Sequence, residues 1–293
     1  MSQPLFPRVD LSKIRNPVIP GWYADPELRL HDGRFYLFPT YSDEFAKQTF
    51  FDAFVSDDLV NWTKMDRVLE LRHVGWSSGS AAWAPSVISR YGTMFMYFSS
   101  GDGDGIGLGV WNRFQRKFVD ALRRPLVGAW PFGAQPIDAN VFVDDDGEAY
   151  LYFGGHSRCV GVKLKPDMNQ LNGEFRLLTP DNYVEGPFMF KRQGRYYFMW
   201  SEGEWVDHSY GVAYAIAESP WGPFHRIDAI LSGDPTLGTG AGHNSVLHIP
   251  GTDDWVICYH RRPAGETDRN HRVTCIDRLT FRPDGTIAPV VIT

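Results

Sequence analysis

Three acidic residues stand beside turn-forming residues at widely separated places in the sequence: Asp25, Asp138 and Glu185. A carboxylic acid can protonate a departing oxygen and a carboxylate can activate water or attack directly, so two such groups suffice to cleave a glycosidic bond. A third carboxylate beside the acid raises its pKa by like-charge repulsion and keeps it protonated near neutral pH. This chemistry requires a fold that brings the three residues together.

Each acid taken alone has a simpler structural interpretation. Asp25 precedes a proline, where an aspartate is usually a turn or cap residue. Asp138 has an equally ordinary interpretation, because acids often end strands. Glu185 is more informative, since a glutamate that enters an aromatic strand is costly to bury without a purpose. The positions of the three acids within a repeat carry more weight than any one of them.

A turn followed by an aromatic or β-branched run recurs along the chain, which is the sequence signal of a strand. The turns fall near residues 33, 92, 147, 194 and 251. The runs that follow them are 34–40, 94–99, 149–153, 196–200 and 255–259. Spacings of about 47 to 59 residues are typical of propeller arrays, and five repeats predict five blades.

Each repeat opens with a short segment ahead of its turn, and these segments contain Asp25, Trp83, Asp138, Glu185 and His243. The first strand of a propeller blade lines the central channel, so equivalent positions of different blades meet near the axis. We therefore expect an all-β, five-bladed β-propeller that forms a single domain over residues 1–293. The three acids should surround one mouth of its channel. Residues 101–109 and 181–182 are expected to be loops.

The composition is that of a globular protein rich in turns, with 43% hydrophobic and 15% aromatic residues, 29 Gly and 20 Pro. A formal charge of −6 without a long basic cluster argues against a nucleic-acid partner. The chain lacks an apolar run of about 18 residues and the order of a signal peptide, so we expect no membrane partner and a cytoplasmic location. Three widely spaced cysteines, Cys159, Cys258 and Cys275, are expected to be reduced thiols.

Several segments together resemble glycoside hydrolase family 43, whose members are five-bladed propellers. The similarity runs in order from 16–18 through 22–26 to 284–290, and so spans nearly the whole chain. By this resemblance Asp25 matches the general base, Asp138 the pKa modulator and Glu185 the general acid. The resemblance also implies inversion of the anomeric configuration.

The same resemblance suggests further site residues. Arg272 matches an arginine that touches the sugar in the first subsite, and His243 matches an axial histidine near which many members hold calcium or another cation. We expect no required cofactor, with Ca²⁺ in the central channel as an optional ion near His243. Trp83 is the preferred candidate for stacking against a sugar. The other aromatic residues near the openings are Trp22, Trp76, Trp130, Phe132 and Trp205.

The leading functional hypothesis is an inverting, exo-acting glycoside hydrolase that releases terminal α-L-arabinofuranose from plant-derived oligosaccharides or polysaccharides. Many β-xylosidases of the family carry an added β-sandwich domain, whereas this sequence stops soon after the fifth repeat, which favours arabinofuranose. β-D-xylosidase is the alternative, followed by endo-arabinanase and galactanase, because a few pocket contacts decide among such sugars.

Two other classes compete with these glycosidases. The related retaining propellers that act on fructosides also use three carboxylates, but the sequence around Asp25, Asp138 and Glu185 departs from their motifs. A non-catalytic sugar-binding propeller would not need the three acids. The oligomeric state is left open by the sequence.

Overall fold

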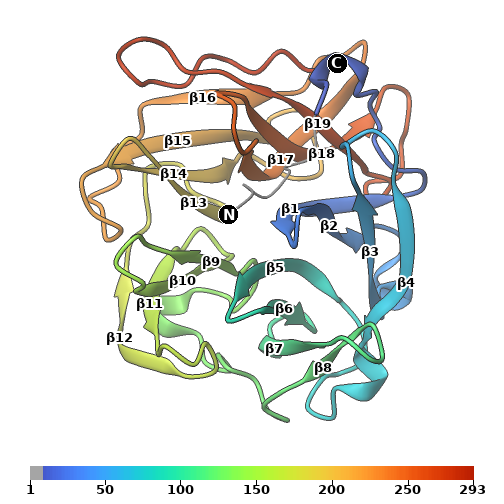
Figure 1. The fold of residues 1–293 in the computed structure, drawn as a ribbon, viewed down its shortest axis with the longest axis vertical. Helices are drawn as coiled ribbons and strands as arrows, with labels where there is room; N and C mark the ends of the chain where they lie inside the picture. The colour runs from blue at the N-terminus through green and yellow to red at the C-terminus, as the bar shows by residue number, and fades with distance from the viewer. Residues whose placement is uncertain (1–8) are drawn as a thin grey trace, which may run out of the picture.

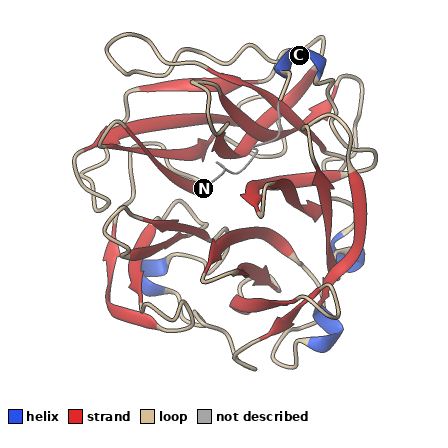
Figure 2. Cartoon of the chain, in the orientation of Figure 1, coloured by secondary structure: helices blue, strands red, loops and turns tan. Residues whose placement is uncertain are grey.

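The computed structural model describes residues 9–293, and within them nineteen β-strands form five sheets arranged in a ring (Figure 1). Helix in this part of the chain is limited to four short 3₁₀ turns, η1 (Leu11–Lys13), η2 (Phe45–Lys47), η3 (Leu71–His73) and η4 (Pro131–Gly133) (Figure 2). The expected five-bladed β-propeller is therefore confirmed.

The strands of each blade follow one another in sequence from the axis outward. Blade 1 contains β1 (Tyr23–His31), β2 (Arg34–Tyr41), β3 (Phe50–Ser56) and β4 (Thr63–Glu70). Blade 2 contains β5 (Trp83–Arg90), β6 (Thr93–Ser100), β7 (Gly105–Asn112) and β8 (Lys117–Asp120). Blade 3 contains β9 (Asn140–Val143), β10 (Ala149–Phe153), β11 (Val160–Leu164) and β12 (Leu171–Leu177).

Blade 4 contains β13 (Glu185–Arg192), β14 (Arg195–Glu202), β15 (Gly211–Ala217) and β16 (Asp228–Ser232). Blade 5 has three strands, β17 (Gly238–His248), β18 (Trp255–Pro263) and β19 (Val273–Leu279). The five aromatic runs predicted from the sequence are the second strands, β2, β6, β10, β14 and β18. Each turn of the repeat joins such a strand to the innermost strand of its blade, as the propeller prediction required.

Each blade turns at its inner end through one residue with a left-handed backbone. The φ angles there are 48° at Asp25, 40° at Ala84, 57° at Asp138, 63° at Gly186 and 44° at His243. In four blades the register between the two inner strands shifts at this place, as it does at a β-bulge. A left-handed backbone costs about 1–2 kcal/mol for residues other than glycine, so the surroundings must hold each turn.

A hydrogen bond to the preceding blade holds each turn, with the backbone N–H of the left-handed residue as donor. Hydroxyl groups accept three of these bonds, from Ala84 to Thr40 (2.7 Å), from Asp138 to Ser99 (3.0 Å) and from His243 to Ser201 (2.9 Å). The other two acceptors are His260 Nδ1, for Asp25 (3.1 Å), and the carboxylate of Asp138, for Gly186. We call these five bonds the clamp ring, because they link every blade to the next.

Asp138 replaces a hydroxyl group in the clamp ring because its own blade has no side chain at the corresponding place. Gly154 occupies that place, since its N–H donates to the carbonyl of Ile137 at 3.0 Å. A Cβ atom on Gly154 would lie 1.9 Å from the carbonyl oxygen of Arg158, so no larger residue fits there. The clamp for blade 4 is therefore supplied by the carboxylate of Asp138.

Aromatic side chains fill the wedge-shaped spaces between blades. One core cluster joins blades 2 and 3 through residues that include Tyr97 and Leu151, and another joins blades 4 and 5 through Tyr197 and Tyr259. The buried tyrosine hydroxyl groups have partners, as where Tyr97 donates to the carbonyl of Met168 at 2.6 Å. Tyrosine thus fills a wide gap and still pairs its polar end.

The segment before β1 closes the ring against blade 5. The N–H groups of Val18 and Tyr23 donate to the carbonyls of Thr274 and Arg272, at 3.0 and 2.8 Å. The side chain of Asn16 exchanges two further hydrogen bonds with the backbone of Ile276. These bonds cover the outer edge of the three-stranded blade, which would otherwise be free to pair.

One loop prediction was wrong. Residues 105–109 belong to β7, although the alternating glycines of 101–109 suggested a loop. The glycines are needed because aromatic rings lie against this strand: a Cβ atom on Gly107 would be 2.5 Å from both Phe98 and Trp76. The second predicted loop, residues 181–182, is a turn.

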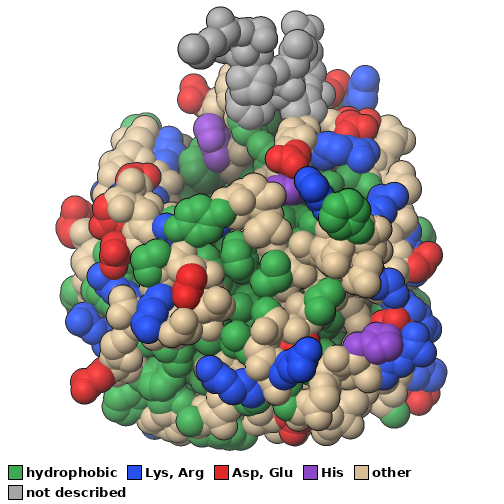
Figure 3. Space-filling model, turned by 60° about the horizontal axis from the view of Figure 1, so that its bottom comes forward, with side chains coloured by type: hydrophobic (Ala, Val, Ile, Leu, Met, Phe, Trp, Pro, Cys, Tyr) green, Lys and Arg blue, Asp and Glu red, His purple; other side chains and the backbone are tan. Residues whose placement is uncertain are grey.

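The outer surface mixes basic, acidic and hydrophobic side chains over the face shown in Figure 3. Within residues 9–293, no helix is long and apolar enough to cross a membrane. Cys159, Cys258 and Cys275 are buried free thiols.

A further hydrogen bond between blades, outside the clamp ring, predicts how the loss of one hydroxyl group changes the stability of the protein. The buried Ser86 hydroxyl accepts the N–H of Val141 from the next blade at 3.1 Å. Ser86→Ala leaves that buried N–H unpaired, so we expect a loss of about 1–3 kcal/mol in the free energy of unfolding, measured with urea. The control Ser232→Ala changes an exposed serine of β16 and should stay within about 0.5 kcal/mol. Equal stability of the two variants would contradict the clamp.

Candidate active site

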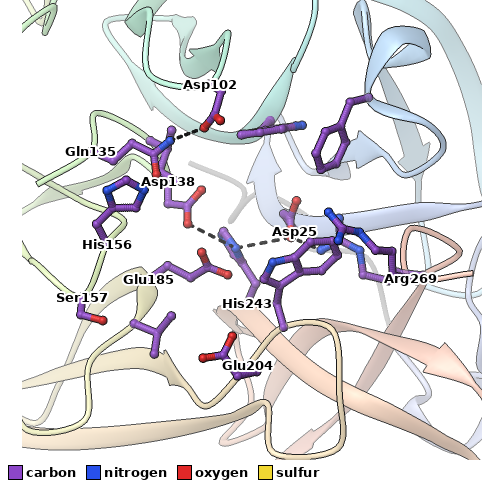
Figure 4. Close-up of a pocket in the computed structure, with 16 residues that line it drawn as sticks. Asp25, Asp102, Gln135, Asp138, His156, Ser157, Glu185, Glu204, His243 and Arg269 are labelled. Atoms are coloured by element: carbon purple, nitrogen blue, oxygen red, sulfur yellow. Dashed lines mark hydrogen bonds and ion pairs between the residues drawn. The ribbon is translucent and has the colours of Figure 1, made fainter.

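A cavity of about 470 Å³ lies where the inner ends of the blades meet (Figure 4). It contains all six residues singled out from the sequence, namely Asp25, Trp83, Asp138, Glu185, His243 and Arg272. Its other lining residues are Phe45, Asp102, Gln135, Ile137, His156, Ser157, Val184, Glu204, Trp205 and Arg269. The volume is typical of a site for a small ligand.

Two adjacent positions in each blade build the floor of this cavity. The left-handed position supplies Asp25, Asp138 and His243. The position just before it supplies Trp83 and Glu185. Glu185 is thus one residue out of step with the other two acids, and it corresponds to Trp83 of blade 2.

Asp25 is surrounded by groups that favour its charged form. Its Oδ1 atom lies 3.2 Å from Arg272 Nη1, 3.2 Å from His260 Nδ1 and 3.4 Å from His243 Nδ1. Burial raises the pKa of Asp25, but the nearby guanidinium of Arg272 is the strongest opposing influence, and this pKa is held below its usual range. Asp25 is therefore an ionised carboxylate at neutral pH.

Both histidines beside Asp25 are neutral at neutral pH. Burial and the nearby guanidinium of Arg272 lower the pKa of His260 to about 4, although Asp25 opposes the change. Burial likewise lowers the pKa of His243. A neutral His260 can accept the N–H of Asp25 at its unprotonated Nδ1 atom, as the clamp ring requires.

Asp138 and Glu185 have the opposite electrostatic environment. Burial and the nearby carboxylates of Glu185 and Asp25 raise the pKa of Asp138 well above its usual value. Burial also raises the pKa of Glu185, an effect that a 2.8 Å hydrogen bond from the Tyr210 hydroxyl partly offsets. The two buried acids repel each other when both are charged, so the pair keeps a proton at a pH where an isolated carboxyl would lose it.

The two predicted sugar contacts lie on the wall of the cavity. Trp83 donates its indole N–H to Gln48, and its ring meets that of Phe45 edge to face at 5.3 Å. Arg272 donates from Nε to the hydroxyl of Ser42 at 3.0 Å, which leaves its Nη1 atom to contact Asp25. Both side chains are held in place by residues of blade 1 or of the loop that follows β2.

Sequence reasoning missed several residues of the site. His260 could have been found, because it occupies on β18 the repeat position that Thr40 and Ser201 occupy on their strands. Tyr210 carries no such signal, and it reaches Glu185 from outside the repeat positions. It fits there because the neighbouring inner residue is Gly242, on which a Cβ atom would lie 2.2 Å from the Tyr210 ring.

Other unforeseen residues form the upper walls of the cavity. The side chain of Gln135 donates to Asp102 at 2.6 Å on one wall. On another wall, the guanidinium of Arg269 lies 4.7 Å from the centre of the Trp205 ring. These residues lie in loops, whose positions depend on the whole fold and are not marked by the repeat.

The cation expected near His243 has few protein ligands available. Within residues 9–293, no three or more His, Cys, Asp or Glu side chains are grouped to hold a metal ion. Calcium takes about six to eight oxygen ligands, whereas His243 offers nitrogen and its Nδ1 atom faces Asp25 and Asp138 at 3.4 and 3.9 Å. These residues do not make a calcium cage by themselves, and an ion near His243 stays a prediction.

The cavity can therefore carry out acid–base chemistry. It holds one carboxylate that is ionised over a wide pH range and a pair of carboxyl groups that retains a proton. Figure 4 shows the carboxyl groups of Asp25, Asp138 and Glu185 turned toward the space around His243. A base and an acid with pKa values pushed apart are what the hydrolysis of a glycosidic bond needs.

Known proteins resemble this chain over almost its full length. The model for glycosyl hydrolases family 43 matches residues 14–287. The β-D-galactofuranosidase xynD of Aspergillus niger is 49% identical over 96% of this chain and 86% of its own length. The xylosidase/arabinosidase 43A of Humicola insolens is 26% identical over 92% of this chain and 98% of its own length. A solved α-L-arabinofuranosidase structure from Clostridium thermocellum is 31% identical with a TM-score of 0.75, covering 92% of this chain and 94% of that one.

The hydrogen bond from Tyr210 to Glu185 predicts a change in titration. A donor to the ionised carboxylate lowers its pKa, so Tyr210→Phe should raise the pKa of Glu185. The measurement is a ¹³C NMR titration of protein labelled at glutamate side chains, with Glu185→Gln used to assign the signal. Tyr152→Phe, which removes a buried hydroxyl bonded to the carbonyl of Pro220, is the control and should leave that pKa in place. An unchanged or lower pKa in Tyr210→Phe would count against the bond.

Proposed function

The chain belongs to glycosyl hydrolase family 43, and from this premise we propose that it is an inverting, exo-acting furanosidase that removes terminal β-D-galactofuranosyl residues from oligosaccharides or polysaccharides. The single observation that carries the choice of sugar is the 49% identity to a β-D-galactofuranosidase over 96% of the chain. This sugar was not among those expected from the sequence.

The chemistry of the sugars explains why galactofuranose and arabinofuranose must be considered together. β-D-galactofuranose and α-L-arabinofuranose share the configuration of their ring carbons and differ in the exocyclic group, which is one carbon longer in galactofuranose. The same base, acid and ring contacts would therefore serve both. Polar groups above the floor of the cavity, such as the Asp102–Gln135 pair, are available to the longer diol.

The two acid–base roles are assigned from the charge of Asp25 and from the proton that the Asp138–Glu185 pair retains. Ionised Asp25 takes a proton from a water molecule, whose oxygen forms the new bond to the anomeric carbon. Protonated Glu185 gives its proton to the glycosidic oxygen as the old bond breaks, so one proton is taken up and one is released in the same step. Arg272, which pairs with Asp25, keeps that base charged and close to the sugar.

Asp138 acts in this proposal by holding Glu185 ready. Its carboxylate accepts the N–H of Gly186 and so fixes the backbone beside the acid. Asp138 and Glu185 repel each other when both are ionised, so the pair retains a proton to higher pH, and in this proposal Glu185 delivers that proton. Activity should fall as the pH rises through the raised pKa of this pair, and the ionised base Asp25 should remain available at low pH.

An α-L-arabinofuranosidase is the second candidate. The 31% identity to a solved arabinofuranosidase structure supports it, as does the expectation drawn from the sequence. A β-D-xylosidase is the third candidate. It is supported by the 26% identity to the xylosidase/arabinosidase 43A of Humicola insolens.

A panel of substrates tests the proposed sugar. We expect kcat/KM to be at least about tenfold higher for 4-nitrophenyl β-D-galactofuranoside than for the α-L-arabinofuranoside, because one extra recognised group is worth about 1–3 kcal/mol. The β-D-xylopyranoside should be poorer still, and NMR of the first product should show inversion. Asp25→Asn, purified in parallel, controls for contaminating enzymes. Preference for the arabinoside would select the second candidate, and preference for the xyloside would refute a furanosidase.

The role of Glu185 as the acid predicts a dependence on the leaving group. Glu185→Gln should lower kcat/KM by about 10²–10⁴-fold on natural saccharides, whose leaving groups need protonation. It should harm a 2,4-dinitrophenyl glycoside far less, because that leaving group departs without a proton. Asp25→Asn should damage both substrates, since water activation is needed for each. Equal damage to both substrates by Glu185→Gln would argue against its role as the acid.

A further inference from the structure

Two exposed aromatic side chains lie on the loop around η4, and one of them packs against a residue that lines the cavity. Trp130 is 43% exposed and Phe132 is 56% exposed. We call them the aromatic shelf. The ring of Trp130 meets that of His156 edge to face with 5.2 Å between centroids, and His156 lines the cavity. The shelf is therefore continuous with the candidate active site.

Trp130 is held firmly although much of it is exposed. Its indole N–H donates to the carbonyl of Gly103 at 3.4 Å, and the ring lies so close to this glycine that a Cβ atom there would be 2.5 Å from it. Gly103 also has a left-handed φ of 98°, which permits this close approach. The ring is thus positioned before any ligand arrives, which reduces the entropy lost on binding.

Phe132 combines a left-handed backbone with an exposed side chain. Its φ and ψ angles are 55° and 20°, in the left-handed region that bulky residues avoid. Its side chain is exposed, so burial of the ring does not offset the strain. The ring of Phe132 is therefore exposed two residues from Trp130 in the chain, and glycine at this position would relieve the backbone conformation.

The direction of the reaction places the leaving group on the shelf side. In an inverting displacement, water attacks from the side of the base and the leaving group departs on the side of the acid. As seen from Asp25 in Figure 4, Ser157 lies beyond Glu185 and His156 lies beyond Asp138. The part of the substrate that leaves on the side of Glu185 is therefore directed toward the wall that contains Ser157 and His156, and Trp130 packs against His156.

We propose that the aromatic shelf of Trp130 and Phe132 is a binding subsite for the leaving-group portion of the substrate, where a sugar ring stacks on the aromatic faces. The C–H face of a sugar is apolar and packs well on an aromatic ring. This inference rests on the proposed glycosidase function and adds that the enzyme prefers oligosaccharides to substrates with a single sugar.

The test compares substrates that reach the shelf with substrates that do not. The substrate that reaches the shelf is a trisaccharide with a terminal furanosyl residue that the enzyme cleaves, either galactofuranosyl or arabinofuranosyl. The substrate without a sugar at the shelf is the 4-nitrophenyl glycoside of the same residue. Trp130→Ala should lower the ratio of their kcat/KM values about 5- to 10-fold, mainly through KM. Phe114→Ala is the matched control, because this phenylalanine is 85% exposed in the turn between β7 and β8; its ratio should equal that of the wild type.

The variant Phe132→Gly distinguishes a loss of substrate binding at the shelf from a loss of protein stability. Glycine tolerates the left-handed backbone, so this variant should keep or raise the melting temperature while it lowers the same ratio. An unchanged ratio in both Trp130→Ala and Phe132→Gly would overturn the shelf, provided that the wild type cleaves the aryl glycoside. A loss confined to Asn182→Ala, in the adjoining cleft that shares Ser157 and Val184 with the cavity, would also overturn it. Failure of the wild type on every glycoside would instead refute the proposed function.

Discussion

The clamp ring is the constraint on which the rest of the structure depends. Each blade turns toward the axis at a residue with a left-handed backbone, and the preceding blade supplies the acceptor for its N–H group. Without that acceptor, a strained turn would also leave a buried donor unpaired. Because the turn and the blade contact are the same feature, the side chains at these positions are fixed relative to one another across the whole ring. A site assembled from separate blades gains its rigidity in this way.

The same ring also sets the charges of the site. Asp25 is clamped by His260 and lies against Arg272, so it is held as a carboxylate in spite of its burial. Asp138 is itself a clamp and faces Glu185 without a cation in contact, so burial and repulsion keep a proton on that pair. Equivalent positions in two blades thus provide opposite pKa changes. The difference comes from what each neighbouring blade places beside the carboxyl group, since both groups are buried to the same degree.

Much of this arrangement could be predicted from the sequence because it is periodic. The spacing of the turns indicated five blades, and the segments ahead of them brought Asp25, Asp138 and Glu185 to one cavity. Non-periodic features could not be predicted. Tyr210 reaches Glu185 through room left by Gly242, and a packing relation between distant residues has no local signal. The alternating glycines of β7 suggested a loop. The sequence pattern alone does not show that aromatic side chains from other segments, Phe98 and Trp76, pack against this strand.

The division between ring and rim limits what family membership says about the sugar. The clamp ring positions the groups that act on the glycosidic bond, and a substitution there disturbs both the chemistry and the contact between blades. The rim residues, such as Trp205 and Trp130, do not take part in the clamp ring. They can therefore differ between proteins that share the same chemistry. Galactofuranose and arabinofuranose differ only in the exocyclic group of the sugar. Selectivity between them must therefore come from the residues at the rim of the cavity. Identity over the whole chain is informative about the sugar only to the extent that it includes these loops.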